Sequence, residues 1–266
     1  MNEFRLIIQP DEDDAESAQV FVDGTVGGKC YRFLLDTGAA RTSLILDDYT
    51  STFESAAKHA SSGLFATNSD DLIVVPNLEV GPIVRKSLSV CRVVDRPAAV
   101  SSLIGMDLLR ELSCHFKFDE NRVVVDFMPE RNAFHDLYLD DRFHPYIDIQ
   151  FGTTTAKAVW DTGASITVVD SQFVEKHPTF FRRVGESTGT DASGSQQTTP
   201  MYSMSDAVIG GYSFPPHKVA GVNLSHVNAT LAIPMDLIVG YSTLRRANWL
   251  FDFPGKRWAI ANLLDA

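Results

Sequence analysis

The chain has 266 residues, of which 44% are apolar and 21% are charged, so it can bury the core of a globular protein. Its 34 acidic residues outnumber its 23 basic residues, and the formal net charge is −11. This balance argues against a nucleic-acid partner, because binding to phosphates needs a basic face. The acidic run over residues 11–14 is expected to be a solvated turn.

The first residues, MNEFRLIIQPDEDD, show no basic leader followed by an apolar stretch, and no apolar run approaches the length of a membrane span. Cys30, Cys91 and Cys114 lack CxxC spacing and are expected to be reduced thiols. We therefore expect a cytoplasmic protein with no membrane partner. The histidines have no HExxH or paired-ligand spacing, and there is no Gly-rich phosphate loop. We expect no metal and no cofactor.

The first predicted element is a hairpin over residues 20–35, VFVDGTVGGKCYRFLL, in which two β-rich runs flank a Gly-Gly turn. Its second strand leads into Asp36-Thr37-Gly38-Ala39. Residues 61–76, SSGLFATNSDDLIVVP, are then expected to contain a second hairpin. The run LIGMDLLRELSCHFKFDENRVVVDF, from Leu103, predicts a short helix over Met106–Glu111 and two strands around a polar turn.

The charged range 129–145, which contains two prolines, is predicted to link an N-terminal part, residues 1–128, to a C-terminal part, residues 146–266. The C-terminal part opens with YIDIQFGTTTAKAVW, again two β-rich runs around a turn, leading into Asp161-Thr162-Gly163-Ala164. Residues 185–204, GESTGTDASGSQQTTPMYSM, predict a hairpin with a polar tip. From Leu237, LIVGYSTLRRANWLFDFPGKRWAIA predicts a helix over Tyr241–Arg246 and two further strands.

The two parts thus repeat the same order of features, and Asp36 and Asp161 stand at matching places, 125 residues apart. A single Asp-Thr-Gly triplet usually marks no more than a tight turn after a strand. Two copies with matched apolar flanks are different, because a repeat can deliver one carboxylate from each copy to a shared site. The repeat therefore predicts a pair of carboxyl groups.

These motifs resemble the retropepsin-like aspartic proteases, which include retroviral and retrotransposon proteases and their cellular relatives. The run LIGMDLLRELSCHFKFDENRVVV is especially similar to the ubiquitin-linked DNA-damage-inducible proteases and to bacterial retropepsin-like proteins. In those families one such unit usually forms a homodimer. Here two units cover nearly all of one chain, a connectivity that resembles pepsin. The resemblance implies an all-β fold of two similar acid-protease barrel lobes, related by a pseudo-twofold axis, with a short helix in each lobe.

The resemblance also implies an aspartic endopeptidase, active as a single-chain monomer on an extended peptide or protein substrate. Two carboxyl groups about 3 Å apart do not both ionise easily, so they share one proton. The ionised group activates a water molecule and the protonated group donates to the leaving nitrogen. The expected catalytic residues are Asp36 and Asp161, and the expected supporting residues are Thr37, Gly38, Ala39, Thr162, Gly163 and Ala164.

By the same resemblance, the two threonines cross-bond their hydroxyls and hold the two loops in register. The two alanines replace a residue whose hydroxyl, in pepsin-type enzymes, stabilises the carboxylate anion. Loss of that bond should raise the pKa of the pair and move activity toward mildly acidic or near-neutral pH.

In this family a hairpin between the aspartate and the apolar-apolar-glycine segment closes over the substrate. The expected substrate-binding residues of the two hairpins are Gly63, Leu64, Phe65, Ala66, Gly189, Thr190, Asp191, Ala192, Ser193 and Gly194. Arg41 and Ile166 occupy matching places in the groove, where retroviral members can carry an acidic residue that this chain lacks. Arg41 either favours an acidic substrate side chain or is a solvated surface arginine. Which hairpin closes stays open.

Two alternatives stand beside the general peptidase. The first is a protease-shaped module that binds a peptide or serves as a scaffold with little or no catalysis, suggested by the unequal hairpins and by Tyr241-Ser242 in place of Met106-Asp107. The second is a processing enzyme specialised for one cellular substrate.

Overall fold

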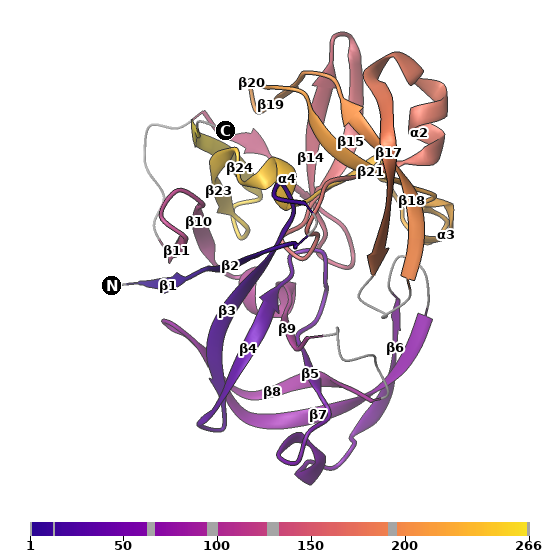
Figure 1. The fold of residues 1–266 in the computed structure, drawn as a ribbon. Helices are drawn as coiled ribbons and strands as arrows, with labels where there is room; N and C mark the ends of the chain where they lie inside the picture. Colours follow the sequence, from indigo (N-terminus) through magenta and orange to yellow (C-terminus); the bar gives the residue numbers. More distant parts are fainter. Residues whose placement is uncertain are drawn as a thin grey trace.

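This computed structural model describes residues 2–12, 14–62, 67–94, 101–126, 133–190 and 196–264. The described chain is built almost entirely from β-strands with a few short helices, which confirms the expected β-rich fold (Figure 1). No helix in these ranges is both long enough and apolar enough to cross a membrane.

The N-terminal sheet contains strands from the first part of the chain, beginning with the predicted hairpin that ends at Asp36. Gly27 and Gly28, at φ +57° and +84°, form its tight turn, a conformation that residues with a Cβ rarely adopt. In spatial order the strands are β2 (Ile7–Pro10), β3 (Ala18–Val26), β4 (Lys29–Leu35), β9 (Leu103–Ile104), β5 (Ser43–Ile45), β8 (Ile83–Val93), β7 (Thr67–Val80) and β6 (Ala57–Ser62).

The C-terminal sheet follows the order of the N-terminal sheet over seven strands. Its strands are, in order, β17 (Phe181–Thr190), β18 (Gln196–Met204), β21 (His217–Val222), β16 (Val168–Asp170), β22 (Leu237–Val239), β15 (Thr154–Trp160), β14 (Pro145–Phe151), β19 (Ala207–Ile209) and β20 (Tyr212–Phe214), with β13 (Tyr138–Leu139) beside β14. Read from β17, it follows the N-terminal sheet read from β6, as far as β14 in one and β3 in the other. Strands β19 and β20 then extend it beyond β14. Strand β15 is parallel to β22, as β4 is to β9. Strand β16 is parallel to β21, as β5 is to β8.

A third sheet joins strands from both parts of the chain, and we call it the shared sheet. Its strands are, in order, β1 (Glu3–Arg5), β11 (Arg122–Val125), β10 (Ser113–Lys117), β23 (Ala247–Asp252), β24 (Arg257–Leu263) and β12 (His135–Asp136). The two predicted terminal hairpins, β10–β11 and β23–β24, meet where β10 pairs with β23. The range predicted as a linker contributes β12 and β13, so part of it is paired.

The helices differ partly from the prediction. The expected helices are present as α1 (Met106–Leu109) and α4 (Tyr241–Leu244), and both are shorter than predicted. A short helix is thus present in each part, and the second part contains two further short helices, α2 (Ser171–Lys176) and α3 (Ser225–Asn228), which the sequence analysis did not single out. Helix α2 begins at Asp170, whose side chain accepts a hydrogen bond from the backbone N–H of Gln172. Two 3₁₀ turns cover Thr50–Thr52 and Pro178–Phe180.

An aromatic cluster packs the shared sheet against strand β15. The Trp160 ring lies 4.4 Å from that of Phe251 and 4.7 Å from that of Phe116, centroid to centroid. All three side chains are fully buried. Such rings bury large apolar areas and prefer tilted or edge contacts, so the cluster stabilises the end of β15 that carries Asp161.

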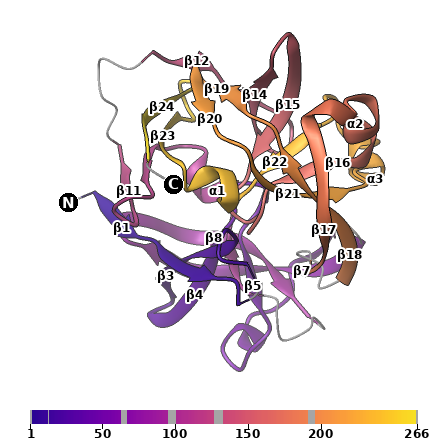
Figure 2. The ribbon, with the colours of Figure 1, turned by 45° about the horizontal axis from the view of Figure 1, so that its top comes forward.

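Two hairpins extend from the sheets on one side of the molecule. In both views the β17–β18 hairpin extends toward the end of β7 that adjoins β6 (Figures 1 and 2). The pairs nearest the turns are Ser62 with Thr67 and Thr190 with Gln196. The hairpins expected from the sequence are therefore present as strands.

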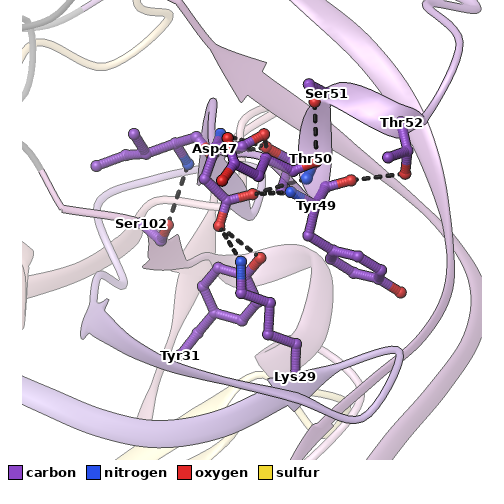
Figure 3. Close-up of polar contacts among 10 residues, drawn as sticks. Lys29, Tyr31, Asp47, Tyr49, Thr50, Ser51, Thr52 and Ser102 are labelled. Carbon is purple, nitrogen blue, oxygen red and sulfur yellow. Dashed lines mark hydrogen bonds and ion pairs between the residues drawn. The ribbon is translucent and has the colours of Figure 1, made fainter.

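A polar network holds the segment that follows β5 against strand β4 (Figure 3). Oδ2 of Asp47 accepts hydrogen bonds from Nζ of Lys29 at 2.7 Å and from the hydroxyl of Tyr31 at 2.9 Å. Its Oδ1 accepts from the backbone N–H groups of Tyr49 and Thr50 at 2.9 and 2.7 Å. Burial alone would raise the pKa of Asp47, but these bonds lower it well below its usual range.

Asp47→Ala should lower the free energy of unfolding by about 1–2 kcal/mol at neutral pH, because several donors lose one charged acceptor. Asp23→Ala is the matched control, since Asp23 pairs with Arg32 in an exposed contact, and it should cost no more than about 0.5 kcal/mol. A lowered carboxyl pKa stabilises the fold above the unfolded value of about 3.9. The difference in the free energy of unfolding between the two variants should therefore disappear as the pH falls through the folded pKa of Asp47. Equal losses in urea denaturation at pH 7 would contradict this account.

Candidate active site

The two Asp-Thr-Gly loops follow the ends of strands β4 and β15. The backbone N–H of Asp36 donates to the carbonyl of Ile104 at 2.9 Å, and that of Asp161 donates to the carbonyl of Val239 at 3.0 Å. Each aspartate is thus fixed by the parallel strand beside it, β9 or β22. Leu35 and Trp160, the residues just before the aspartates, are fully buried.

The carboxyl groups of Asp36 and Asp161 lie side by side and share a hydrogen bond. Oδ1 of Asp161 also accepts the backbone N–H groups of Gly38 at 3.2 Å and Gly163 at 2.8 Å. A Cβ at Gly38 would lie 2.5 Å from Oδ2 of Asp161, and one at Gly163 would lie 2.5 Å from Cγ of Asp36. The close approach of each loop to the opposite carboxyl group requires glycine at both positions.

The environment of this pair raises the pKa of both carboxyl groups. For Asp36, burial is the largest cause, followed by the negative charge of Asp161 and the hydrogen bond between them. For Asp161, burial again dominates, while the N–H groups of Gly163 and Gly38 partly oppose it. A pair of this kind holds one proton over a range of pH, and its titration belongs to both groups together. It can accept a proton from water and donate one to a leaving group.

The two loops are joined by reciprocal hydrogen bonds between Thr37 and Thr162. The Thr162 hydroxyl accepts the backbone N–H of Thr37 at 3.2 Å and donates to the carbonyl of Leu35 at 2.6 Å. The Thr37 hydroxyl accepts the backbone N–H of Thr162 at 3.0 Å and donates to the carbonyl of Trp160 at 2.8 Å. Both threonines are almost completely buried, so these bonds fix the spacing of the two aspartates in a dry environment.

A second polar contact joins each Asp-Thr-Gly loop to a helix, which is α1 in the first part and α4 in the second. In the first part, Thr42 donates to the Asp107 carboxyl group through its N–H, at 3.0 Å, and through its hydroxyl, at 2.7 Å. In the second part, the N–H of Thr167 donates to the hydroxyl of Ser242 at 3.0 Å. Ser242 therefore provides the acceptor that Asp107 provides in the first part. The replacement that suggested a binding module preserves this contact.

Among the remaining loop residues, the two alanines make matching contacts, whereas Arg41 and Ile166 differ. Ala39 and Ala164 accept the first N–H groups of α1 and α4 through their carbonyls, both at 2.8 Å. Arg41 is exposed, and its charge lowers the pKa of Asp107 against the larger opposing effect of burial. Ile166 is half-buried against an apolar cluster that includes Val168. The two matching positions thus carry an exposed cation in the first part and a half-buried apolar side chain in the second.

The expected residues at the tips of the hairpins are only partly described. Gly189 is exposed in β17, and Thr190 ends that strand. The other expected tip residues, Gly63, Leu64, Phe65, Ala66, Asp191, Ala192, Ser193 and Gly194, lie outside the described residues.

The structure also brings residues to the site whose roles the sequence did not predict. Thr42, Asp107, Thr167 and Ser242 support the loops through the contacts above, and the charge of His144 acts on Asp161. Single polar residues of this kind form no motif, although the Thr at a fixed distance after each triplet is visible as part of the repeat. In the described ranges no group of three or more His, Cys, Asp or Glu side chains is placed to hold a metal ion.

Comparison with known protein families agrees with the chemistry of this site. Residues 22–108 match the family model described as aspartyl protease, a range that includes the Asp36 loop and strand β9. The match supports an aspartyl protease family and protease activity in general. No curated protein matches the chain.

Thr162→Val should lower the free energy of unfolding by about 2–4 kcal/mol, because it leaves the buried N–H of Thr37 and the carbonyl of Leu35 without partners. Thr188→Val is the matched control, since its exposed hydroxyl bonds only to that of Thr198, and it should cost no more than about 0.5 kcal/mol. Chemical denaturation of both variants tests the difference, and similar losses would show that the reciprocal bonds add little.

Asp36→Asn should raise the free energy of unfolding at pH 7. The unfolded aspartate ionises near its ordinary pKa of about 3.9. The folded pKa is raised, so the folded state binds more protons above that value and stability falls as the pH rises toward the folded pKa. A neutral Asn removes this loss, and its gain in melting temperature over wild type should grow between pH 4 and neutrality. A variant less stable than wild type at pH 7 would contradict the raised pKa.

Proposed function

We propose that the chain is a retropepsin-like aspartic endopeptidase that hydrolyses peptide bonds with a water molecule activated by Asp36 and Asp161. The observation that carries this proposal is the hydrogen bond shared by the buried carboxyl group of Asp36 and the half-buried one of Asp161, whose pKa values are both raised. Two adjacent carboxyl groups that share one proton suit this reaction, because one group serves as base and the other as acid.

In this proposal each part of the chain forms one lobe, residues 1–128 and 146–266, related by a pseudo-twofold axis. The repeated strand order of the N-terminal and C-terminal sheets supports it. So do the matching contacts of the two loops with β9 and β22. One chain then supplies both aspartates and acts as a monomer. The expected cytoplasmic location stays a prediction.

The proposed substrate is an extended peptide segment that lies between the two hairpins and the aspartates. The hairpins extend toward one another on one side of the molecule, which supports this placement (Figures 1 and 2). A peptide bound there can pair with strand edges through its backbone, while alternate side chains enter pockets. The half-buried Ile166 supports an apolar pocket on one side. The exposed Arg41 supports a polar environment on the other.

Asp36→Asn and Asp161→Asn, each alone, should lower cleavage of a diverse peptide library by about 10²–10⁴-fold or more, because each removes the shared proton chemistry. Products are identified by mass spectrometry. Asp206→Asn, an exposed aspartate on the connection between β18 and β19, is the matched control and should retain full activity. Residual cleavage that is the same in both active-site variants would point to a contaminant or another mechanism.

The same assay separates the alternatives. Specific activity should not depend on enzyme concentration, because both aspartates belong to one chain. A rise with concentration would instead indicate pairing between chains. Peptide binding by wild type without any cleavage would favour the binding module.

A further inference from the structure

A short turn before strand β14 places an imidazole beside one of the two carboxyl groups. Strands β14 and β15 pair with Tyr146 opposite Val159. His144 and Asp161 each lie one residue outside the paired strands, and continuing this antiparallel register by two residues would set them opposite one another. Residues that oppose one another in such a pair have side chains on the same face of the sheet, close enough to interact.

The position of His144 is fixed by Asp140. Oδ1 of Asp140 accepts the backbone N–H groups of Arg142 and His144, both at 2.9 Å. Its Oδ2 lies 2.7 Å from Nδ1 of His144. Both side chains are largely buried. Burial alone would raise the pKa of Asp140, but the bonds from His144 and the backbone lower it, so Asp140 is an anion that orients the ring.

The turn is also held from the first part of the chain. Phe143 has φ +64°, a left-handed conformation that a residue with a Cβ adopts only where the surroundings impose it. The guanidinium of Arg110 lies 4.2 Å from the centre of the Phe143 ring. The conformation that presents His144 is therefore fixed by contacts from both parts of the protein.

The other carboxyl group has no such neighbour at the matching place. Strands β3 and β4 pair with Phe21 opposite Leu34. Continuing that register by two residues sets Gln19 opposite Asp36. Glutamine carries no charge at any pH, whereas histidine can carry a positive one. The repeat thus contains an uncharged residue on the Asp36 side and a titratable one on the Asp161 side.

We propose that His144, oriented by Asp140, is a positioning residue that makes the two carboxyl groups unequal, so that Asp161 is favoured as the ionised partner and Asp36 as the protonated one. This proposal rests on the proposed function for its catalytic consequence. When the proton is shared, Asp161 is then the group that faces water as the base, and Asp36 is the group that donates to the leaving nitrogen.

The electrostatics of the site agree with this assignment. The charge of His144 lowers the pKa of Asp161, in the same direction as the N–H groups of Gly163 and Gly38 and against the larger effect of burial. For Asp36, burial and the charge of Asp161 act together to raise the pKa. The other charged groups around the turn are Asp140, the exposed Asp141 and Arg142 within it, and Arg110 over the Phe143 ring.

The test replaces His144 with the residue found at the matching place. In His144→Gln the acid limb of the pH profile of kcat/KM should move to higher pH by about half a unit or more, because a cation near the pair is lost. The plateau should change by less than about twofold, since no group that touches the substrate is removed. Asp140→Asn keeps the imidazole and removes the anion beside it, so it should not move the limb to higher pH, because only a negative charge near the pair is lost. His135→Gln, an exposed histidine on β12, is the matched control and should leave the profile unchanged.

A second measurement does not depend on activity. Carboxyl ¹³C shifts of Asp-labelled protein, assigned with the Asp36→Asn and Asp161→Asn variants, report which group is ionised as the pH is changed. In wild type the Asp161 carbon should show the ionised shift at a pH where the Asp36 carbon still shows the protonated one, and in His144→Gln the two should approach each other. The same carboxyl titration in wild type and His144→Gln would overturn the proposal. Absence of peptide cleavage together with unequal titration would remove the proposed function and keep the role of His144.

Discussion

The reciprocal hydrogen bonds between Thr37 and Thr162 are the constraint on which the site depends. They join two loops that are far apart in sequence and hold them at one distance, through backbone N–H and carbonyl groups that water does not reach. Without this link the burial of two carboxyl groups would favour separation of the loops, because like charges repel strongly where water is excluded. The Trp160 cluster packs the shared sheet against strand β15, which leads into one of the two loops, and so helps to hold that loop in place.

A buried pair of carboxyl groups destabilises the fold near neutral pH, and the stability that compensates for it must come from elsewhere. The aromatic cluster and the Asp47 network, which lie outside the two Asp-Thr-Gly loops, are contacts of this stabilising kind. The polar groups around the aspartates are instead arranged by fixed N–H donors and by glycines that admit the opposite carboxyl group. Such a separation between stabilising contacts and the polar groups of a site is typical of sites whose environment shifts the pKa of a reactive group at the expense of stability.

Local patterns predicted much of this structure from the sequence. The hairpins that lead into Asp36 and Asp161, and the helices at Met106 and Tyr241, follow from alternating apolar residues, turn residues and the repeat itself. The pairing of β10 with β23 was not predictable, since both strands are short apolar runs whose partner is chosen by the assembled core. Helix α2 was missed although Asp170 is a favourable N-cap. A lone histidine such as His144 forms no motif, and only the strand register reveals its neighbour.

In the proposed arrangement two similar units lie in one chain, and this allows the two sides of the site to differ. In a homodimer any residue near one carboxyl group is repeated near the other, so the pair is equivalent by symmetry. Here one pair of matching places carries Gln19 and His144, and another carries Arg41 and Ile166. Asp107 and Ser242 show that such divergence can preserve a structural contact while its charge is lost. Because a substrate peptide itself has a direction, a site with unequal sides can match that direction, which a symmetric site cannot do in its free state.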